Sequence, residues 1–244
     1  SVPSRATFVL RIDADPSEGG PDDAFSQLLP VQRARSIRAL VENVRKARAD
    51  RRVAALLVRP AGLTSPYLAK VQELRDAILD FKRSGKPAIA YLETGGQTEY
   101  YLATACDRIY LAPSSPLQLT GMASYSLFLR GTLDAIGAYA DMLHIGAYKA
   151  APNQLTEKTF TPAHREMEQS LNADSYEQLI AAIAAGRKKS DADVRALVDE
   201  GPFLAEDARR AGLVDGVAYE DEVGDLAKVP LGRGKRIDLA DYDR

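Results

Sequence analysis

Short runs of continuously apolar residues alternate with amphipathic segments as far as residue 111 of the chain. Such runs are typical of strands covered on both faces of a parallel sheet. The segments between them repeat apolar residues at helical spacing, as in Ile37, Leu40, Val41 and Val44. This pattern predicts strands over 7–12, 53–58, 88–92 and 107–111, a polar loop over 13–30, and helices over about 35–48, 66–82 and 100–106.

Beyond residue 111 the apolar runs are less regular, but helices again dominate. Thr161 followed by Pro162 predicts the start of a long helix, because proline is tolerated at the first helical position. Ser190 with Asp193 three residues later predicts a capped helix start. The predicted helices span about 127–136, 162–185, from 190 onward and 203–211, and an apolar strand is predicted over 138–145.

Strands that alternate with helices through short connections imply right-handed crossovers and a mainly parallel sheet. The fold class expected is therefore α/β. With 244 residues the chain is long enough for one large domain. We expect that domain to cover residues 1–223 and the polar tail at 224–244 to be a linker.

Composition narrows the classes of function. The chain is 45% hydrophobic and carries 32 basic against 34 acidic residues without a long run of either sign, so no nucleic-acid partner is expected. No apolar run approaches the roughly 18 residues that cross a bilayer. The sequence begins at Ser1 rather than methionine, so we expect a processed or trimmed product whose membrane anchor, if it has one, lies outside it.

Familiar catalytic and cofactor sites are missing from the sequence. It contains neither GxGxxG after the first strand nor a P-loop nor a G-x-S-x-G elbow. A single cysteine, Cys106, excludes a CxxC metal site, and the two histidines lack zinc-enzyme spacing, so no metal and no cofactor are expected. Cys106 and His144 are interpreted as packed residues and His164 as a surface residue. Glu93 and Glu99 are either solvated turn charges or a carboxylate pair.

Lys149 follows the predicted strand and a glycine turn at Gly146. On pattern alone, a lysine at a strand end is a solvated surface charge. A longer succession of motifs changes that interpretation. The motifs are, in order, Pro60-Ala61-Gly62, a helix ending in Ser84-Gly85-Lys86-Pro87, the turn Gly95-Gly96, the segment from Tyr100-Tyr101 to Pro113, Leu119-Thr120-Gly121, Gly146-Ala147-Tyr148-Lys149, and Gly201-Pro202-Phe203 through Gly212-Leu213-Val214-Asp215.

This succession resembles the signal peptide peptidase A (protease IV) family, whose fold is ClpP/crotonase-like, over roughly residues 35–223. The resemblance implies a serine nucleophile activated by a lysine general base, with Lys149 at the lysine position. Such a lysine must be neutral, which requires burial that lowers its pKa from about 10.4 toward 7–8. The resemblance also implies that Gly62, Gly95 and Gly96 belong to the substrate and oxyanion region.

The nucleophile position departs from the family pattern. Gln97 lies three residues before the aromatic pair at Tyr100, where the family has serine, and a glutamine amide cannot attack a carbonyl. The oxyanion turn departs as well: the family has a Pro-Gly-Gly run, whereas Pro60-Ala61-Gly62-Leu63 retains one glycine in the matching place, and Leu63 hinders close approach of a substrate backbone. Lysine retained with serine replaced resembles the N-terminal half of the long, duplicated form of the family, in which a C-terminal domain supplies the serine.

The resemblance implies hydrolysis of remnant signal peptides, a serine-bearing C-terminal domain as partner, a homo-oligomer, and a place on the extracytoplasmic side of a bacterial membrane. The chain by itself would then be inactive. Two alternatives stay open. One is a non-catalytic scaffold that grips substrate in the same assembly. The other is a crotonase-type acyl-CoA enzyme, which needs two backbone N–H donors for a thioester enolate.

Overall fold

The computed structural model describes residues 5–18, 36–64, 68–231, 236–238 and 242. They belong to two compact units, which we call unit 1 (Ser1–Thr120 with Ile180–Arg244) and unit 2 (Gly121–Leu179). Most of the loop expected over 13–30 and the expected start of the second helix at residue 66 lie outside the described residues.

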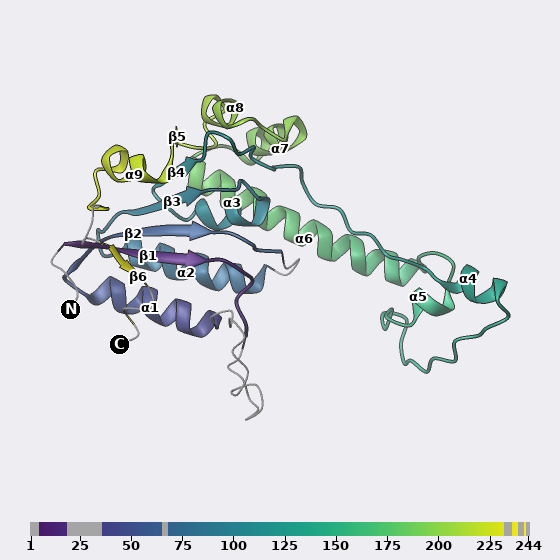
Figure 1. The fold of residues 1–244 in the computed structure, drawn as a ribbon. Coiled ribbons are helices and arrows are strands. Elements are labelled where there is room, and N and C mark those ends of the chain that lie inside the picture. The colour runs from purple at the N-terminus through teal and green to yellow at the C-terminus, as the bar shows by residue number, and fades with distance from the viewer. Residues whose placement is uncertain (1–4, 19–35, 65–67, 232–235, 239–241, 243–244) are drawn as a thin grey trace. The chain divides into compact units, whose positions relative to one another are not determined.

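Unit 1 is built on a parallel sheet, drawn as arrows in Figure 1. Every strand pair in the described part of the sheet is parallel, in the order β5-β4-β3-β2-β1-β6. The four strands predicted before residue 112 are confirmed as β1 to β4. The strands are β1 (Ala6–Ile12), β2 (Val53–Pro60), β3 (Ala88–Leu92), β4 (Arg108–Leu111), β5 (Gly216–Val217) and β6 (Arg236–Asp238).

The helices of unit 1 cover this sheet. Because β1 to β4 follow one another in one direction, right-handed crossovers place the connecting helices on one face, and Figure 1 shows α1 and α2 together on that side. The helices are α1 (Ile37–Ala49), α2 (Ala69–Lys82), α3 (Gln97–Ala103), α7 (Asp191–Glu200), α8 (Ala205–Arg210) and α9 (Glu220–Ala227). A further helix, α6 (Pro162–Arg187), begins in unit 2 and ends in unit 1.

Local sequence signals explain where several helices begin and end. The predicted stripe of α1, including Ile37 and Val44, is buried, and Ser36 caps the helix by accepting from the Ala39 amide. Lys86 closes the other end, since its Nζ donates to the carbonyl oxygens of residues 47, 48 and 50 at 3.1, 2.9 and 2.7 Å. The predicted capping box of Ser190 with Asp193 is confirmed.

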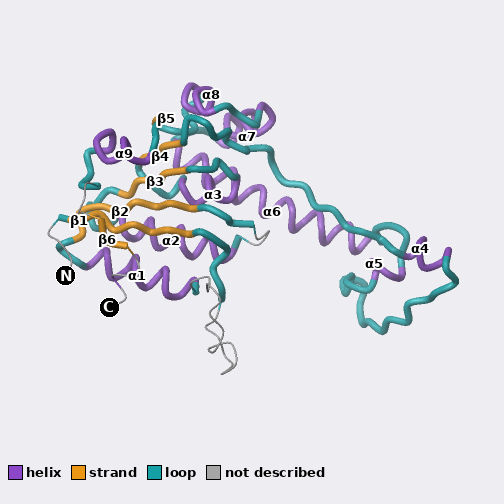
Figure 2. Tube along the Cα trace, in the orientation of Figure 1, coloured by secondary structure: helices purple, strands orange, loops and turns teal. Residues whose placement is uncertain are grey.

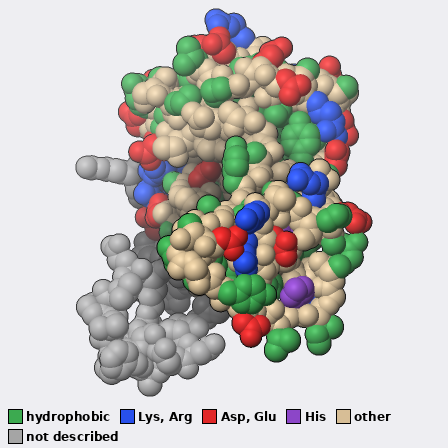
Figure 3. Space-filling model, turned by 90° about the vertical axis from the view of Figure 1, so that its right-hand side faces the viewer, with side chains coloured by type: hydrophobic (Ala, Val, Ile, Leu, Met, Phe, Trp, Pro, Cys, Tyr) green, Lys and Arg blue, Asp and Glu red, His purple; other side chains and the backbone are tan. Residues whose placement is uncertain are grey.

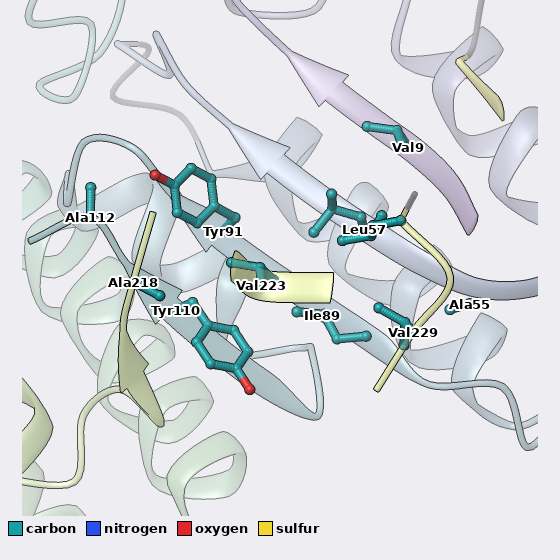
Figure 4. Packing of buried hydrophobic residues seen from close by; sticks show 11 residues of the cluster. Val9, Ala55, Leu57, Ile89, Tyr91, Tyr110, Ala112, Ala218, Val223 and Val229 are labelled. Atoms are coloured by element: carbon teal, nitrogen blue, oxygen red, sulfur yellow. The ribbon is translucent and has the colours of Figure 1, made fainter. Parts of the chain in front are cut away.

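The second face of the sheet carries its own hydrophobic cluster. Successive strand residues point to opposite faces, so Val9, Leu57 and Ile89 meet on this one, where Val223 of α9 packs against them (Figure 4). Val229 and Leu231, which follow α9, belong to the same cluster.

The segment 224–244 was expected to be a polar linker. Its described residues include the end of α9 and the strand β6, in which Ile237 pairs with Phe8 of β1 and is buried. This part of the tail is therefore folded into unit 1. The strand has only three residues and one buried apolar side chain, which is too short a pattern to predict a strand from the sequence.

Unit 2 consists mostly of loop, which Figure 2 colours teal. Its helices are α4 (Arg130–Ala135), α5 (Asn153–Thr156) and the first part of α6. The strand predicted over 138–145 is wrong, because these residues form no strand and Leu143 and Ile145 are 102% and 91% exposed. An apolar run shows that side chains need cover, but a strand also needs a neighbouring strand, and unit 2 contains none.

Candidate active site

Lys149 lies in a turn of unit 2. Gly146 adopts a left-handed φ of +90°, and the Lys149 amide donates to the Gly146 carbonyl at 3.2 Å. This φ suits glycine, which lacks the β-carbon that makes the conformation costly. The predicted glycine turn before the lysine is therefore confirmed, although no strand precedes it.

An open, mainly apolar cavity of about 600 Å³ adjoins this turn. Lys149 lines this cavity and is exposed, so its side chain lies beside apolar walls. His144 also lines the cavity and is exposed, so its interpretation as a packed strand residue is wrong. The lining residues, all in unit 2, are Leu143, His144, Ile145, Lys149, Ala151 and Pro152.

The loop that carries Lys149 is tied to α6 by its neighbour. The Tyr148 hydroxyl donates to Glu166 Oε2 at 2.9 Å, and this carboxylate raises the pKa of the Tyr148 phenol. This hydrogen bond holds Tyr148 against α6 and therefore restricts the positions that the adjacent Lys149 can take. This pairing could not be predicted from the local pattern, because Tyr148 and Glu166 lie 18 positions apart in the chain.

The start of α6 is packed around His164, which is 4% exposed. Its ring lies 4.8 Å from that of Phe160 and 5.9 Å from that of Phe128, and its Nε2 lies 3.7 Å from Glu168 Oε1. Placing His164 at the surface was therefore wrong. A histidine three positions into a helix points outward or inward according to the tertiary packing, which the local pattern does not contain.

Gln97 is the first residue of α3 in unit 1. Its Oε1 accepts a hydrogen bond from the Thr120 amide at 3.2 Å. Backbone contact requires glycine at position 95, where a β-carbon would overlap the Pro116 carbonyl oxygen, and a β-carbon on Gly96 would displace the Glu99 carboxylate. The turn that precedes α3 thus contains the two expected glycines, followed by the Gln97 carboxamide.

Gly62 begins the corresponding turn after β2. Its φ is +66°, and a β-carbon there would be 2.7 Å from the Asp13 carbonyl oxygen. The next amide, that of Leu63, donates to Glu99 Oε1 at 2.9 Å. Glu99 is 7% exposed, so its interpretation as a solvated turn charge is wrong. Glu93, by contrast, is exposed and pairs with Arg59 at 3.0 Å, so the two carboxylates have separate partners.

The structure thus brings Gly62, Gly95, Gly96 and Gln97 to the carboxyl ends of β2 and β3 in unit 1, with Glu99 joining the two turns. Lys149 belongs to unit 2. Sequence reasoning missed Glu99 as a member of this site, and a carboxylate in the first turn of a helix after two glycines was the one available signal.

Other candidate chemistry is not supported by the geometry. Cys106 is buried, and burial raises the pKa of its thiol to about 12, as expected of a packed residue. In the part of the chain that the structure describes, no three histidine, cysteine or carboxylate side chains come together as a metal site would require.

The chain is similar to several known proteins. It is 32% identical over 211 residues to the chloroplastic serine protease SPPA of Arabidopsis thaliana, covering 86% of this chain and 31% of that protein. It is 26% identical over 192 residues to Protease 4 of Salmonella typhi, covering 75% of this chain and 31% of that protein. The chain therefore spans about a third of the length of these relatives.

A solved structure shows the fold. An enoyl-CoA hydratase/isomerase family protein from Silicibacter pomeroyi superimposes with a TM-score of 0.50 at 18% identity, covering 100% of this chain and 81% of that one. The fold is accordingly ClpP/crotonase-like, as expected. The model of peptidase family S49 matches residues 80–231, a range that includes both Gln97 and Lys149. Together with the 32% identity to the plant protease, this match shows that the chain belongs to peptidase family S49.

Proposed function

We propose that this chain is the lysine-bearing half of a Ser–Lys peptidase, in which Lys149 is the general base and another domain supplies the serine. The observation that carries the proposal is that Lys149 lines an apolar cavity, in a chain whose position 97 holds glutamine. A base without a nucleophile needs a second component.

The chemistry defines what that component must do. A neutral lysine amine takes the proton of the serine hydroxyl as the oxygen attacks the peptide carbonyl, and returns it to the leaving amine. Lysine is neutral near pH 7 only when removed from water, a change worth roughly 4 kcal/mol for three pKa units. Lys149 is exposed, so a partner surface that covers it and the neighbouring Leu143 and Ile145 would favour the neutral amine.

The exposed apolar residues of unit 2 support such an interface. Clustered large apolar side chains that remain in water mark protein–protein contact sites. Figure 3 shows hydrophobic side chains among charged ones on one face of the molecule. The exposed large apolar residues of unit 2 are Tyr125, Leu127, Leu129, Ile136, Tyr139, Met142, Leu143, Ile145, Tyr148 and Leu171.

We take the main partner to be a serine-bearing C-terminal domain, because the plant protease and the Salmonella Protease 4 are each about three times as long as the matched region. Further copies of the same protein would cover the rest of the apolar surface in a homo-oligomer. Since the cavity beside Lys149 is apolar, we propose apolar peptides as substrates, in particular remnant signal peptides. The setting proposed is the extracytoplasmic side of a bacterial membrane, reached through an anchor outside this chain.

Among the helices of the described residues, none combines the length and apolar character that a membrane span requires.

The second candidate is a non-catalytic scaffold in the same assembly, which Gln97 and the occupied Leu63 amide favour. A crotonase-type acyl-CoA enzyme is less consistent with the turn after β2. That chemistry needs free N–H donors, but the Ala61 amide donates to the Ile12 carbonyl at 2.7 Å and the Leu63 amide donates to Glu99.

The test compares this chain with the full-length protein. A quenched fluorescent apolar peptide is offered to each, and each is treated with a fluorophosphonate that labels activated serines. We expect hydrolysis by the full-length protein but not by residues 1–244 alone, and the label on a serine outside this chain. Hydrolysis by the isolated chain, or a label within it, would overturn the proposal.

A further inference from the structure

A buried carboxylate binds a backbone amide at the carboxyl edge of the sheet. The amide is that of Leu63, in the turn after β2, and the carboxylate is that of Glu99, in the first turn of α3. The carboxyl ends of parallel strands are where α/β proteins of open-sheet type bind their ligands. Here the Glu99 side chain, rather than a ligand, binds the Leu63 amide at this edge.

The turn is built to present the Leu63 amide. The Ala61 amide is used by the Ile12 carbonyl at 2.7 Å, and the Thr64 amide and hydroxyl bind Asp15 Oδ2 at 3.2 and 2.8 Å. Between them, the left-handed Gly62 changes the chain direction. The flanking bonds fix the turn, and the Leu63 N–H is directed toward α3.

Glu99 is equally well placed. Its Oε1 is 2.9 Å from the Leu63 nitrogen, and the side chain is 7% exposed. Its other oxygen, Oε2, occupies the space that a β-carbon on Gly96 would need. None of the ion pairs between described residues includes Glu99, so the backbone amide is the donor that this carboxylate has there.

From this geometry we propose that the Glu99 carboxylate fills the oxyanion position of this half and closes it to substrate. A carboxylate oxygen matches an oxyanion in charge, and 2.9 Å lies within the range at which amide donors stabilise a developing oxyanion. A substrate oxygen approaching Leu63 would meet an occupied donor and a like charge. The Thr120 amide is likewise used, by Gln97.

The inference deepens the proposed function: this half would contribute the lysine, while its own oxyanion position is closed by Glu99 and its position 97 lacks a serine. Restoring a serine at position 97 would therefore not restore a complete site. The amide of Leu63 becomes available to an anion when the carboxylate is removed.

Amide hydrogen exchange of the full-length protein tests this directly, with fragments that resolve Leu63. We expect Glu99→Ala to speed exchange at the Leu63 amide about tenfold, because the variant loses one hydrogen bond to that amide. Added acetate should bind the freed amide and slow its exchange again. Acetate should have no effect on wild type. Glu93→Ala removes an exposed carboxylate nearby and serves as the control, with wild-type exchange expected.

Peptides from β4 and α1 report whether the variant is folded. If Glu99→Ala unfolds the protein, Glu99→Gln replaces it: a neutral acceptor binds an amide less strongly than a charged one, so exchange at Leu63 should still be faster than in wild type. Unchanged exchange at Leu63 in the folded variant, or no effect of acetate on Glu99→Ala, would overturn the proposal. Exchange is independent of peptide hydrolysis, so a failure of the proposed peptidase function would be seen separately.

Discussion

Gly186 of α6 lies directly against the carbonyl oxygen of Thr104, at the end of α3. A β-carbon built on the glycine would overlap that oxygen and would be 2.9 Å from the Thr104 β-carbon. Both residues belong to unit 1, where Arg75 of α2 also joins them by donating to Thr104 Oγ1 at 3.1 Å and to the Ala182 carbonyl at 3.4 Å. The end of α6 is thus packed on α3 through the one residue type that allows such an approach.

Gly186→Ala should therefore destabilise the protein, even though alanine is the better helix former. Overpacking of this kind costs about 1–3 kcal/mol. Urea unfolding followed by circular dichroism measures the free energy of unfolding. The matched control is Gly131→Ala in α4, where a β-carbon meets nothing within 4 Å and should be neutral or stabilising by up to about 1 kcal/mol. Equal effects of the two substitutions would contradict the account.

Asp50 predicts a specific acid sensitivity. A hydrogen bond from Arg52, with Nη2 2.7 Å from Asp50 Oδ2, lowers the pKa of the Asp50 carboxyl from 3.8 to about 2. Because the folded pKa is the lower one, the stabilisation is complete above the unfolded pKa and is lost as pH falls through the folded value. Wild type should exceed Asp50→Asn in free energy of unfolding at pH 6, and by less at pH 3.

Urea denaturation at the two pH values measures that difference. In an Arg52→Gln background the effect of Asp50→Asn should be smaller at pH 6, because the main cause of the low pKa has been removed. A difference that does not change between pH 6 and pH 3 would show that Asp50 contributes by some other means.

Cys106 should be inert in the folded protein. Its thiol is buried, and burial raises its pKa to about 12, so the reactive thiolate is rare at neutral pH. We expect a disulfide reagent that releases a coloured thiolate to give no signal with the native protein over an hour at pH 8 and one equivalent after denaturation. Rapid reaction of the native protein would mean that the end of α3 opens readily.

Most of the α/β framework could be predicted from the sequence, because the physical signals there are local. Continuous apolar runs, such as the one ending at Val58, alternate with amphipathic helices, and this alternation indicates buried strands of a parallel sheet. Unit 2 could not be predicted in this way. Leu143 and Ile145 belong to an apolar run like those of the buried strands, yet both side chains are exposed.

The candidate site divides along the same line. Lys149 and Gln97 were identified because a succession of motifs resembles a family, and their positions follow the chain. Glu99 was not, because its burial depends on Gly62, which is distant in sequence and turns the Leu63 amide toward it. His144 was predicted to be packed but is exposed, and His164 was predicted to be at the surface but is buried. The residues next to a histidine in sequence do not show which of the two environments the tertiary packing gives it.

The central claim is that Lys149 is the base of the assembled peptidase, and peptide hydrolysis by full-length Lys149→Ala tests it most directly. The matched control is Lys158→Ala, which removes an exposed lysine of the same unit that pairs with Asp134 at 2.9 Å. We predict that Lys149→Ala lowers kcat/KM by about 10²–10⁴-fold while Lys158→Ala stays within about twofold of wild type. Wild-type hydrolysis by a folded Lys149→Ala protein would contradict the account and leave the scaffold as the function of this chain.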